Sequence, residues 1–182
     1  MAPATQEAMT DDATEGFSEF YEAWFDRVYN YAYHRTGSSV RADEVASDTF
    51  ARVFSSWASF DPNKGDRRTW LFSIAFRAIA DHFRSEKRRL WLSLGLLRRP
   101  AESDPGPAAD LEAEQEHREL LAALAALSTQ HREVVSLKFF GGMTNRAIAE
   151  LTGLSEANVG IILFRSVRRM RGQFTAGEKH NG

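Results

Sequence analysis

The side chains best suited to chemistry in this sequence are arginines set among aromatic residues. One such group lies in residues 61–89, where a loop precedes a helix-forming run that opens at Thr69. On that helix Arg77 and Arg84 share one strip, with Trp70 at its edge. A cationic strip bordered by an aromatic side chain can hold backbone phosphates and stack on unpaired bases. A solvated helix face is the usual alternative, and the dense arginine content favours nucleic-acid binding.

A second group belongs to residues 144–159, whose spacing is typical of a helix-turn-helix. Ala149 is small where two helices must cross closely, and Gly153 follows where the turn needs a left-handed backbone. Ser155 can cap the second helix, whose first turn would enter a major groove. Apolar residues are spaced to fill the wedge between the helices: Ile148, Leu151, Leu154, Val159 and Ile162. An ordinary helical hairpin is the alternative, and the combined spacing favours DNA binding.

The second helix of this motif divides into two faces at 100° per residue. The inward face is expected to hold Val159, Ile162, Leu163 and Ser166. The outward face is expected to hold Ala157, Asn158, Ile161, Phe164, Arg165 and Arg168. Outward arginines suit phosphates, and the outward Ile161 and Phe164 suit thymine methyl groups or the sugar backbone. Packing of Ile161 and Phe164 on another helix is an equally open alternative.

Signatures of enzymes and metal sites are missing from the sequence. Cysteine is absent, which excludes a disulfide scaffold, a thiolate metal site and a cysteine nucleophile. The five histidines are scattered. Glu114 and His117 form one Glu-x-x-His pair, whereas a di-metal helical bundle needs two such pairs. Nucleotide-binding and hydrolase motifs are also missing, so we expect no catalytic residue, no metal and no cofactor.

Helices must position both groups, because strand-like alternation is absent. A first helix is expected on the aromatic face from Phe17 to Val28. The other expected helices cover residues 42–57, 69–89, 111–127, 128–140, 144–151 and 155–171, with N-caps at Ser128, Thr144 and Ser155. The helix over 42–57 is expected to point Val45, Phe50, Val53, Phe54 and Trp57 inward.

We predict an all-α chain of two small helical domains joined by a flexible linker. The expected boundaries are a disordered acidic start over 1–16, a first domain over 17–91, a linker over 92–110, a second domain over 111–171 and a flexible tail over 172–182. The linker carries three prolines and no clear period: Pro100, Pro105 and Pro107.

Charge and hydropathy narrow the class of protein. The net charge of the 182 residues is −2, which argues against a uniformly basic nucleic-acid coat but permits a local basic face. Basic residues outnumber acidic ones within 128–171. The start of the chain lacks the pattern of a secretory signal, and no window reaches the ~20 apolar residues of a membrane span. We therefore expect a cytoplasmic protein without membrane insertion.

The two domains together resemble an extracytoplasmic-function (ECF) sigma factor of bacterial RNA polymerase. The resemblance covers about residues 17–171. Its region-two part lies in FYEAWFDRVYNYAYHRTGS, RADEVASDTFARVFSSW and FDPNKGDRRTWLFSIAFRAIADHFR. Its region-four part lies in LAALSTQHREVVSLKFFGGMTNRAIAELTGLSEANVGIILFRSVRRMR. The resemblance implies a region-two helical bundle and a region-four helix-turn-helix in a factor that binds core RNA polymerase, directs it to promoters and helps to melt the DNA.

The resemblance also implies partners and site residues. Contact with the β′ coiled coil of core polymerase would involve Asp43, Glu44, Asp48 and Phe50, and the β subunit is a further expected partner. The minus-ten element of promoter DNA would be held by Asn63, Lys64, Arg67, Arg68, Trp70, Arg77 and Arg84. The minus-thirty-five element would be read by Asn145, Arg146, Ser155, Asn158, Ile161, Phe164, Arg165 and Arg168. An anti-sigma factor would hold the free protein inactive.

The sequence departs from the family pattern in three places. Arg67 stands where the family usually has an aromatic residue, and Arg77 where it often has asparagine. The recognition helix carries Gly160, Ile161 and Ile162 where basic or hydroxyl residues are frequent, which predicts a more apolar readout. The alternative function is an autonomous helix-turn-helix regulator with an N-terminal sensor or dimerisation module, which would bind duplex DNA tightly on its own.

Overall fold

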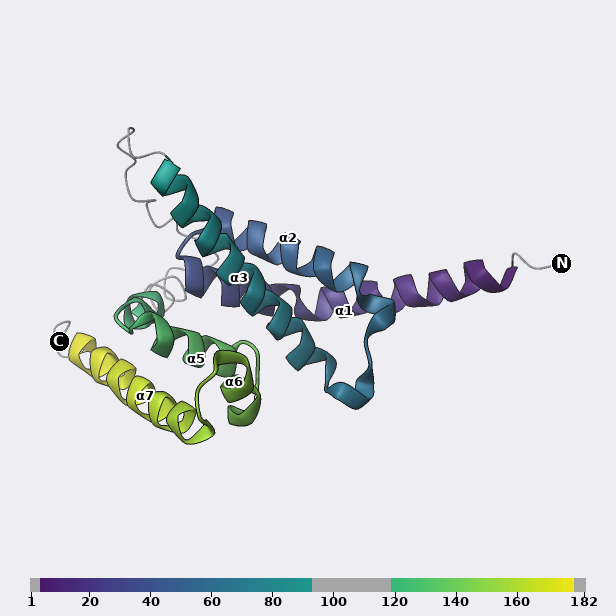
Figure 1. The fold of residues 1–182 in the computed structure, drawn as a ribbon. Helices are drawn as coiled ribbons and strands as arrows, with labels where there is room; N and C mark the ends of the chain where they lie inside the picture. The colour runs from purple at the N-terminus through teal and green to yellow at the C-terminus, as the bar shows by residue number, and fades with distance from the viewer. Residues whose placement is uncertain (1–3, 93–118, 179–182) are drawn as a thin grey trace.

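The computed structural model describes residues 4–92 and 119–178, and within these ranges the chain is helical without strands (Figure 1). The elements in order are α1 (Ala4–Thr36), α2 (Ser39–Ser55), the 3₁₀ helices η1 (Trp57–Ser59) and η2 (Pro62–Lys64), α3 (Arg67–Leu92), a helical segment over 119–125, α5 (Thr129–Phe139), α6 (Asn145–Thr152) and α7 (Glu156–Glu178). The all-α prediction is confirmed. The predicted linker lies outside the described residues except for its first residue, as do residues 111–118 of the helix expected over 111–127.

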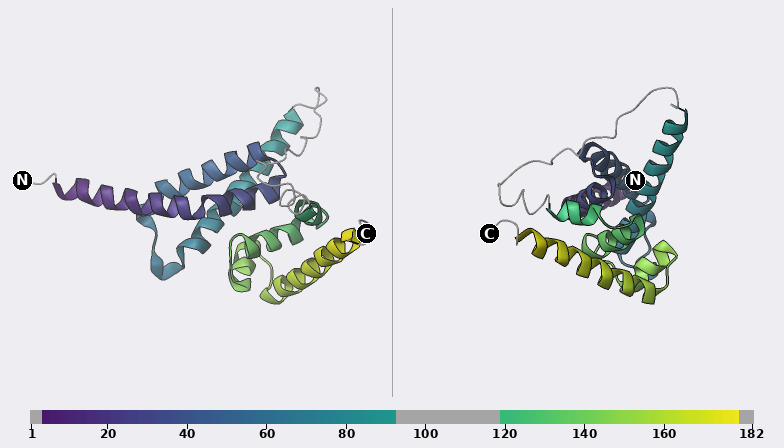
Figure 2. Two further views of the ribbon diagram at one scale, coloured as in Figure 1. Left: turned by 180° about the vertical axis from the view of Figure 1, so that it is seen from behind. Right: turned by 90° about the vertical axis from the view of Figure 1, so that its left-hand side faces the viewer.

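The first domain is a bundle of α1, α2 and α3 (Figures 1 and 2). The aromatic face of α1 packs on both of the other helices, with Tyr31 completely buried against the ring of Phe72. Apolar residues recur every three or four positions along each helix, so each presents one continuous stripe to the core. Residues at the centre include Val28, Val45, Phe50, Val53, Leu71, Phe72 and Ile79.

Two segments that the sequence predicts to be disordered or flexible are helical within the described residues. The predicted disordered start, 1–16, is helical from Ala4 onward, and α1 extends beyond the bundle (Figure 1). Helix α7 likewise runs to Glu178 through most of the predicted tail, 172–182. Both extensions follow from cooperativity, because adding a residue to an existing helix gains a hydrogen bond without the cost of nucleation.

Helix α3 opens two residues earlier than predicted. Asp66 is its N-cap: the carboxylate accepts a bond from the Thr69 amide at 2.9 Å and from the Thr69 hydroxyl at 2.7 Å. Burial by itself would raise the pKa of the Asp66 carboxyl. These bonds and nearby Arg68 outweigh it and hold the pKa below its usual value. Thr69 therefore lies inside the first turn.

Another correction concerns Phe54, which was expected to point inward. Its side chain is 56% exposed, although its ring touches that of Phe17 at 4.9 Å between centroids. Nine residues separate Phe54 from the buried Val45, which at 100° each is half a turn around α2. The two residues therefore lie on opposite faces.

The second domain contains the predicted helix-turn-helix. The three predicted caps are present, with bonds from the His131, Ala147 and Asn158 amides to the hydroxyls of Ser128, Thr144 and Ser155. Gly153 ends α6 with φ of 75°, a left-handed conformation that glycine adopts without a Cβ clash. The turn sets α6 and α7 at 107° to each other.

The two domains are in contact through α1 and α5 (Figure 2). The Tyr31 hydroxyl donates to Glu133 Oε1 at 2.6 Å, and Arg35 Nη2 lies 2.6 Å from Glu133 Oε2. The ring of His34 stacks on Phe140 with centroids 4.5 Å apart. One continuous core therefore joins residues from both domains.

Among the described residues, no single helix is long and apolar enough to cross a bilayer, and only the bent pair α6–α7 meets the length and composition criterion when joined.

We expect Asp66→Ala to lower the free energy of unfolding by about 1 kcal/mol, because the first turn of α3 loses its cap. Chemical denaturation followed by circular dichroism measures this change. Asp66→Asn keeps an acceptor for the Thr69 amide and serves as the matched control. The lowered pKa adds a pH signature: the wild-type advantage holds above the carboxyl's unfolded pKa and disappears as pH falls through the folded value. Equal losses in both variants would contradict the capping role.

Candidate nucleic-acid interface

The loop before α3 is shaped by two aspartates and one glycine. Asp61 Oδ1 accepts bonds from the Asn63 amide and its side-chain nitrogen, each at 3.0 Å. Gly65 has φ of 152°, which residues with a Cβ rarely adopt, and Asp66 then starts α3. The loop therefore presents Asn63 and Lys64 to solvent beside the first turn of α3.

Arg67 lies on an aromatic cluster at this end of the first domain, formed by Trp57, Phe60 and Trp70. Its guanidinium carbon is 4.1 Å from the ring centre of Trp57 and 5.0 Å from that of Phe60. The ring centres of Phe60 and Trp70 are 5.1 Å apart. The aromatic faces attract the cation and restrict its rotamers, so the exposed planar guanidinium has a defined place at the rim of the cluster.

The cationic strip predicted on α3 is exposed. Arg77 faces solvent, and Arg84 has a side chain that is 71% exposed and pairs with Asp81 at 3.2 Å. Seventeen residues separate Arg67 from Arg84, which is about 25 Å along a helix. Arg68 differs from the others, because it faces the second domain: a Cβ atom on Gly142 would lie 3.2 Å from its Nη1.

The acidic residues predicted to contact polymerase lie on the exposed side of α2. Asp43, Glu44 and Asp48 are all exposed. Phe50 is not: it is 3% exposed, and its ring centre lies 4.8 Å from that of Tyr21. Its position four residues after Ala46 and three before Val53 puts it on the buried face. The assignment of Phe50 to a partner surface is therefore wrong, and Phe50 is a core residue.

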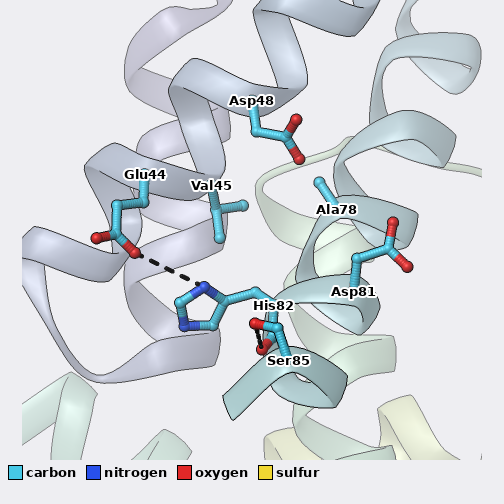
Figure 3. Close-up of a pocket in the computed structure, with 7 residues that line it drawn as sticks. All are labelled: Glu44, Val45, Asp48, Ala78, Asp81, His82 and Ser85. Atoms are coloured by element: carbon cyan, nitrogen blue, oxygen red, sulfur yellow. Dashed lines mark hydrogen bonds and ion pairs between the residues drawn. The ribbon is translucent and has the colours of Figure 1, made fainter. Parts of the chain in front are cut away.

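A cavity of about 250 Å³ lies between α2 and α3 beside these acids (Figure 3). Glu44, Val45 and Asp48 line it from α2, and Ala78, Asp81, His82 and Ser85 line it from α3. His82 Nδ1 is 3.8 Å from Glu44 Oε2 across the opening. Three carboxylates border this hollow, and although Arg52 pairs with Asp48 and Asp81, the exposed Glu44 at its rim can attract a cationic partner.

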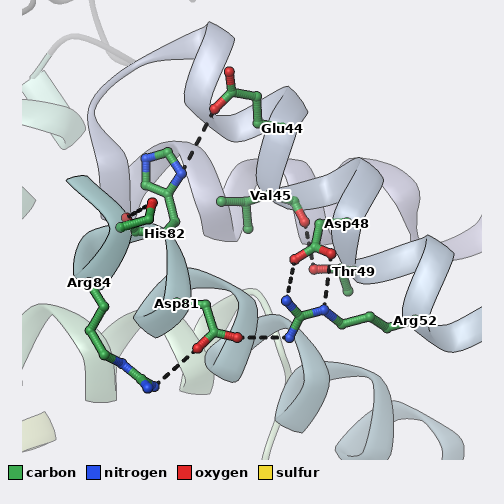
Figure 4. Close-up of polar contacts among 9 residues, drawn as sticks. Glu44, Val45, Asp48, Thr49, Arg52, Asp81, His82 and Arg84 are labelled. Carbon is green, nitrogen blue, oxygen red and sulfur yellow. Dashed lines mark hydrogen bonds and ion pairs between the residues drawn. The ribbon is translucent and has the colours of Figure 1, made fainter. Parts of the chain in front are cut away.

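A row of alternating charges joins α2 to α3 beside the cavity (Figure 4). Arg52 bonds Asp48 on its own helix, with Nη2 2.7 Å from Oδ2, and bonds Asp81 of α3 at 3.0 Å. These hydrogen bonds, that to Asp81 first, raise the pKa of Arg52. Arg84 continues the row through Asp81. Arg52 was not found from the sequence, where it has no motif to mark it.

The exposed face of α7 agrees with the predicted division. Val159, Ile162 and Ser166 are at most 4% exposed, whereas Ile161 is 49% and Phe164 is 68% exposed. Ile161 and Phe164 are therefore exposed on the outward face and are not buried against another described helix of this chain. The other outward residues of α7 are also exposed: Asn158, Arg165 and Arg168.

The remaining predicted contacts lie on α6 and at the N-cap of α7. Arg146 is exposed and pairs with Glu150 at 3.0 Å, and Ser155 is used as the cap of α7. Asn145 is half-buried, and its Oδ1 accepts a bond from Lys138 Nζ at 3.0 Å. This bond leaves the Asn145 amide nitrogen on the side of α7, near Gly160.

The polar contacts between the domains were also missed by sequence reasoning. Tyr31 and Glu133 are 102 positions apart, so no local pattern links them. No cluster of three or more possible metal ligands occurs within residues 4–92 and 119–178.

Comparison with known proteins identifies both domains. The family model for Sigma-70 region 2 matches residues 20–89, and that for Sigma-70 region 4 matches residues 117–170. The ECF RNA polymerase sigma factor BldN of Streptomyces coelicolor is 30% identical over 156 residues, which are 86% of this chain and 59% of BldN. The ECF RNA polymerase sigma factor RpoE of Cereibacter sphaeroides is 28% identical over 174 residues, covering 92% of each protein.

Solved structures share the fold. The sigma factor RpoE of Bartonella quintana, crystallised with the anti-sigma factor NepR, superposes with a TM-score of 0.71 at 18% identity over 88% of this chain and 98% of that chain. CnrH in complex with the cytosolic domain of CnrY gives a TM-score of 0.63 at 23% identity over 90% of each chain. Matches to both sigma-70 regions, in order and on the two domains described above, place the chain in the sigma-70 family, among its ECF sigma factors.

Proposed function

We propose that this protein binds core RNA polymerase, directs it to specific promoters and helps to open the DNA, without catalysing a reaction itself. The observation that supports the proposal is the presence on one chain of two exposed surfaces of different chemistry, each suited to nucleic acid. The exposed face of α7 suits the edges of paired bases, and the Arg67 cluster with the α3 strip suits an unpaired strand. A role at RNA polymerase implies the cytoplasm.

Recognition of the minus-thirty-five element would use the first turns of α7. Ser155 and Asn158 stand at the helix N-terminus, where unpaired backbone amides favour a phosphate. Arg165 and Arg168 lie further along the exposed face and would fix the register on the phosphates. Ile161 and Phe164 offer apolar surface that fits thymine methyl groups better than it fits hydrogen-bonding base edges.

Capture of the minus-ten element would use the other surface. A base that leaves the duplex loses stacking, and a contact with an aromatic or guanidinium plane returns about 1–3 kcal/mol. Arg67, held flat on Trp57, offers such a plane, and Trp70 stands beside it. Arg77 and Arg84, with Asn63 and Lys64 in the loop, would hold the backbone of the same strand.

Docking on polymerase would use the acidic side of α2. Asp43, Glu44 and Asp48 would meet basic side chains of the β′ coiled coil, and the cavity beside Glu44 has room for one such side chain. The same acids would repel DNA, so polymerase and promoter strands are expected on different sides of the first domain.

The chain between Leu92 and Glu119 is long enough for the two domains to act apart. At full extension it reaches about 90 Å. A spacer of about 17 base pairs measures about 58 Å. One chain can therefore bridge both promoter elements when polymerase holds the domains apart.

We further propose that an anti-sigma factor controls this protein. The two structural neighbours described above were each solved with a second protein, named as the anti-sigma factor NepR in the case of RpoE. The apolar surface formed by Leu163, Phe164 and Val167 on α7 is a candidate contact. A protein bound there would also keep α7 from reaching DNA.

Run-off transcription on a genomic promoter library tests the proposal. Core polymerase with this chain is expected to start at a defined set of sites, whereas core polymerase alone starts at none of them. The chain alone is expected to bind those promoters weakly or undetectably. Tight and specific duplex binding without polymerase would instead identify an autonomous regulator.

Replacing Trp70 with alanine is expected to impair strand opening more than closed-complex formation, because the stacking surface acts only on unpaired bases. We expect about a tenfold loss of open complex, equivalent to about 1.4 kcal/mol, measured by permanganate reactivity of unpaired thymines. Trp91→Ala is the matched control, since Trp91 lies on the same helix and is 74% exposed. Circular dichroism verifies folding, because Trp70 also packs on Phe60. Equal loss at both stages would contradict a role in melting.

Charge reversal on α2 is expected to weaken polymerase binding without unfolding the protein. The variant Asp43→Lys/Glu44→Lys leaves the Asp48–Arg52 pair intact and should lower affinity for core polymerase at least tenfold in a fluorescence anisotropy titration. Glu19→Lys/Glu22→Lys makes the same charge change on the exposed side of α1 and should bind normally. Normal binding by the α2 variant would remove the proposed docking face.

A further inference from the structure

We infer that Tyr31, Arg35 and Glu133 form a latch that holds the free chain closed, in a state that cannot engage both promoter elements at once. The inference rests on the proposed function for what the closed state prevents. The contact itself is independent of that function. It joins the last turns of α1 in the first domain to the start of α5 in the second.

The latch has the geometry of a specific contact. Glu133 receives Arg35 on one oxygen and the Tyr31 hydroxyl on the other, each at 2.6 Å. The side chains of Arg35 and Glu133 are 6% and 11% exposed, and Tyr31 is completely buried. Arg35 also reaches the Thr129 carbonyl oxygen at 3.4 Å and lies over the Phe83 ring.

Closure covers part of the proposed minus-ten surface. The loop after α5 lies on the inner side of α3, where a Cβ on Gly141 would be 3.2 Å from the Phe72 ring and one on Gly142 would be 3.2 Å from Arg68 Nη1. The Arg68 Nε atom is shielded from solvent in this arrangement. A residue assigned to promoter DNA is thus partly covered by the other domain, although 39% of its side chain stays exposed.

The closed state also holds the two proposed DNA-binding surfaces too close together. Gly142 lies two residues before the cap of α6, and α6 packs directly on α7. Packed helices are about 8–10 Å apart, so the recognition helix, one helix beyond α6, lies within about 20 Å of the first domain. The two promoter elements are separated by about 58 Å of duplex. The domains must therefore part before both elements can be bound.

The chemistry of the contact allows it to open. Burying a carboxylate and a guanidinium costs several kcal/mol of hydration each, which the pair regains only while the geometry holds. When the domains separate, water rehydrates both charges. A contact of this kind is specific when closed and inexpensive to break as a whole, whereas removal of one partner leaves the other charge buried and uncompensated.

Distance measurements on the full-length chain test the latch. The sequence has no cysteine, so spin labels can be placed uniquely at Glu22→Cys and Arg169→Cys, which are exposed positions on α1 and α7. Double electron–electron resonance between the two labels should give one short, narrow distance distribution for the otherwise wild-type chain. Glu133→Gln and Tyr31→Phe should each lengthen and broaden it, with the ratio of open to closed chains rising by about tenfold or more.

The matched control is Glu86→Gln, which removes the ion pair between Arg41 and Glu86 inside the first domain. It should leave the distribution unchanged. Circular dichroism reports whether each variant is folded. If Glu133→Gln does not fold, Tyr31→Phe still decides the test. A distribution that does not respond to either latch variant, or that responds equally to Glu86→Gln, overturns the inference.

Transcription separates this inference from the proposed function. Glu133→Gln should reach half-maximal run-off transcription at a lower concentration than wild type, because less binding energy is spent on opening. If the distances respond but no variant confers promoter choice on core polymerase, the latch stands and the proposed function fails. If promoter choice is present but the distances do not respond, the function stands and the latch fails.

Discussion

The relative arrangement of the two domains depends on how a buried carboxylate is compensated where they meet. Burial raises the pKa of Glu133, while Arg35 and the Tyr31 hydroxyl favour its ionised form. Burial also raises the pKa of Tyr31, and the neighbouring Glu133 acts in the same direction, so the hydroxyl stays a donor. The domains are consequently held in one relative orientation by directional bonds, in addition to the undirected contacts of the shared apolar core.

Charge is sorted by surface in a way that the net value of −2 conceals. Carboxylates gather on the exposed side of α2, while arginines gather on the α3 strip and on α7. Arg52 lies on the border, bonded to Asp48 and to Asp81. Because it ties the two helices together, the acidic and basic surfaces keep a fixed angle to each other even though every member of the row is partly exposed.

Local patterns in the sequence were sufficient for much of the second domain. The caps at Ser128, Thr144 and Ser155, the glycine turn at Gly153 and the inward and outward faces of α7 all depend on residues a few positions apart. Phe54 failed for the opposite reason: which arc of α2 is buried depends on where α1 and α3 pack. The spacing placed Phe50 inward, which is confirmed, and only the family resemblance assigned it to a partner surface. The contact between Tyr31 and Glu133 depends on tertiary structure alone, and the same holds for the position of Arg67 on Trp57 and Phe60.

The uninterrupted length of α1 has a mechanical consequence. Near its end the helix carries Arg35, and about 27 Å earlier it carries Phe17, whose ring packs edge-on against Trp57 beneath Arg67. A stiff rod of this length converts a tilt of about 3° at one end into a shift of about 1.4 Å at the other. The position of the Arg67 guanidinium is therefore sensitive to the angle of α1, whose far end is bonded to the second domain through Arg35.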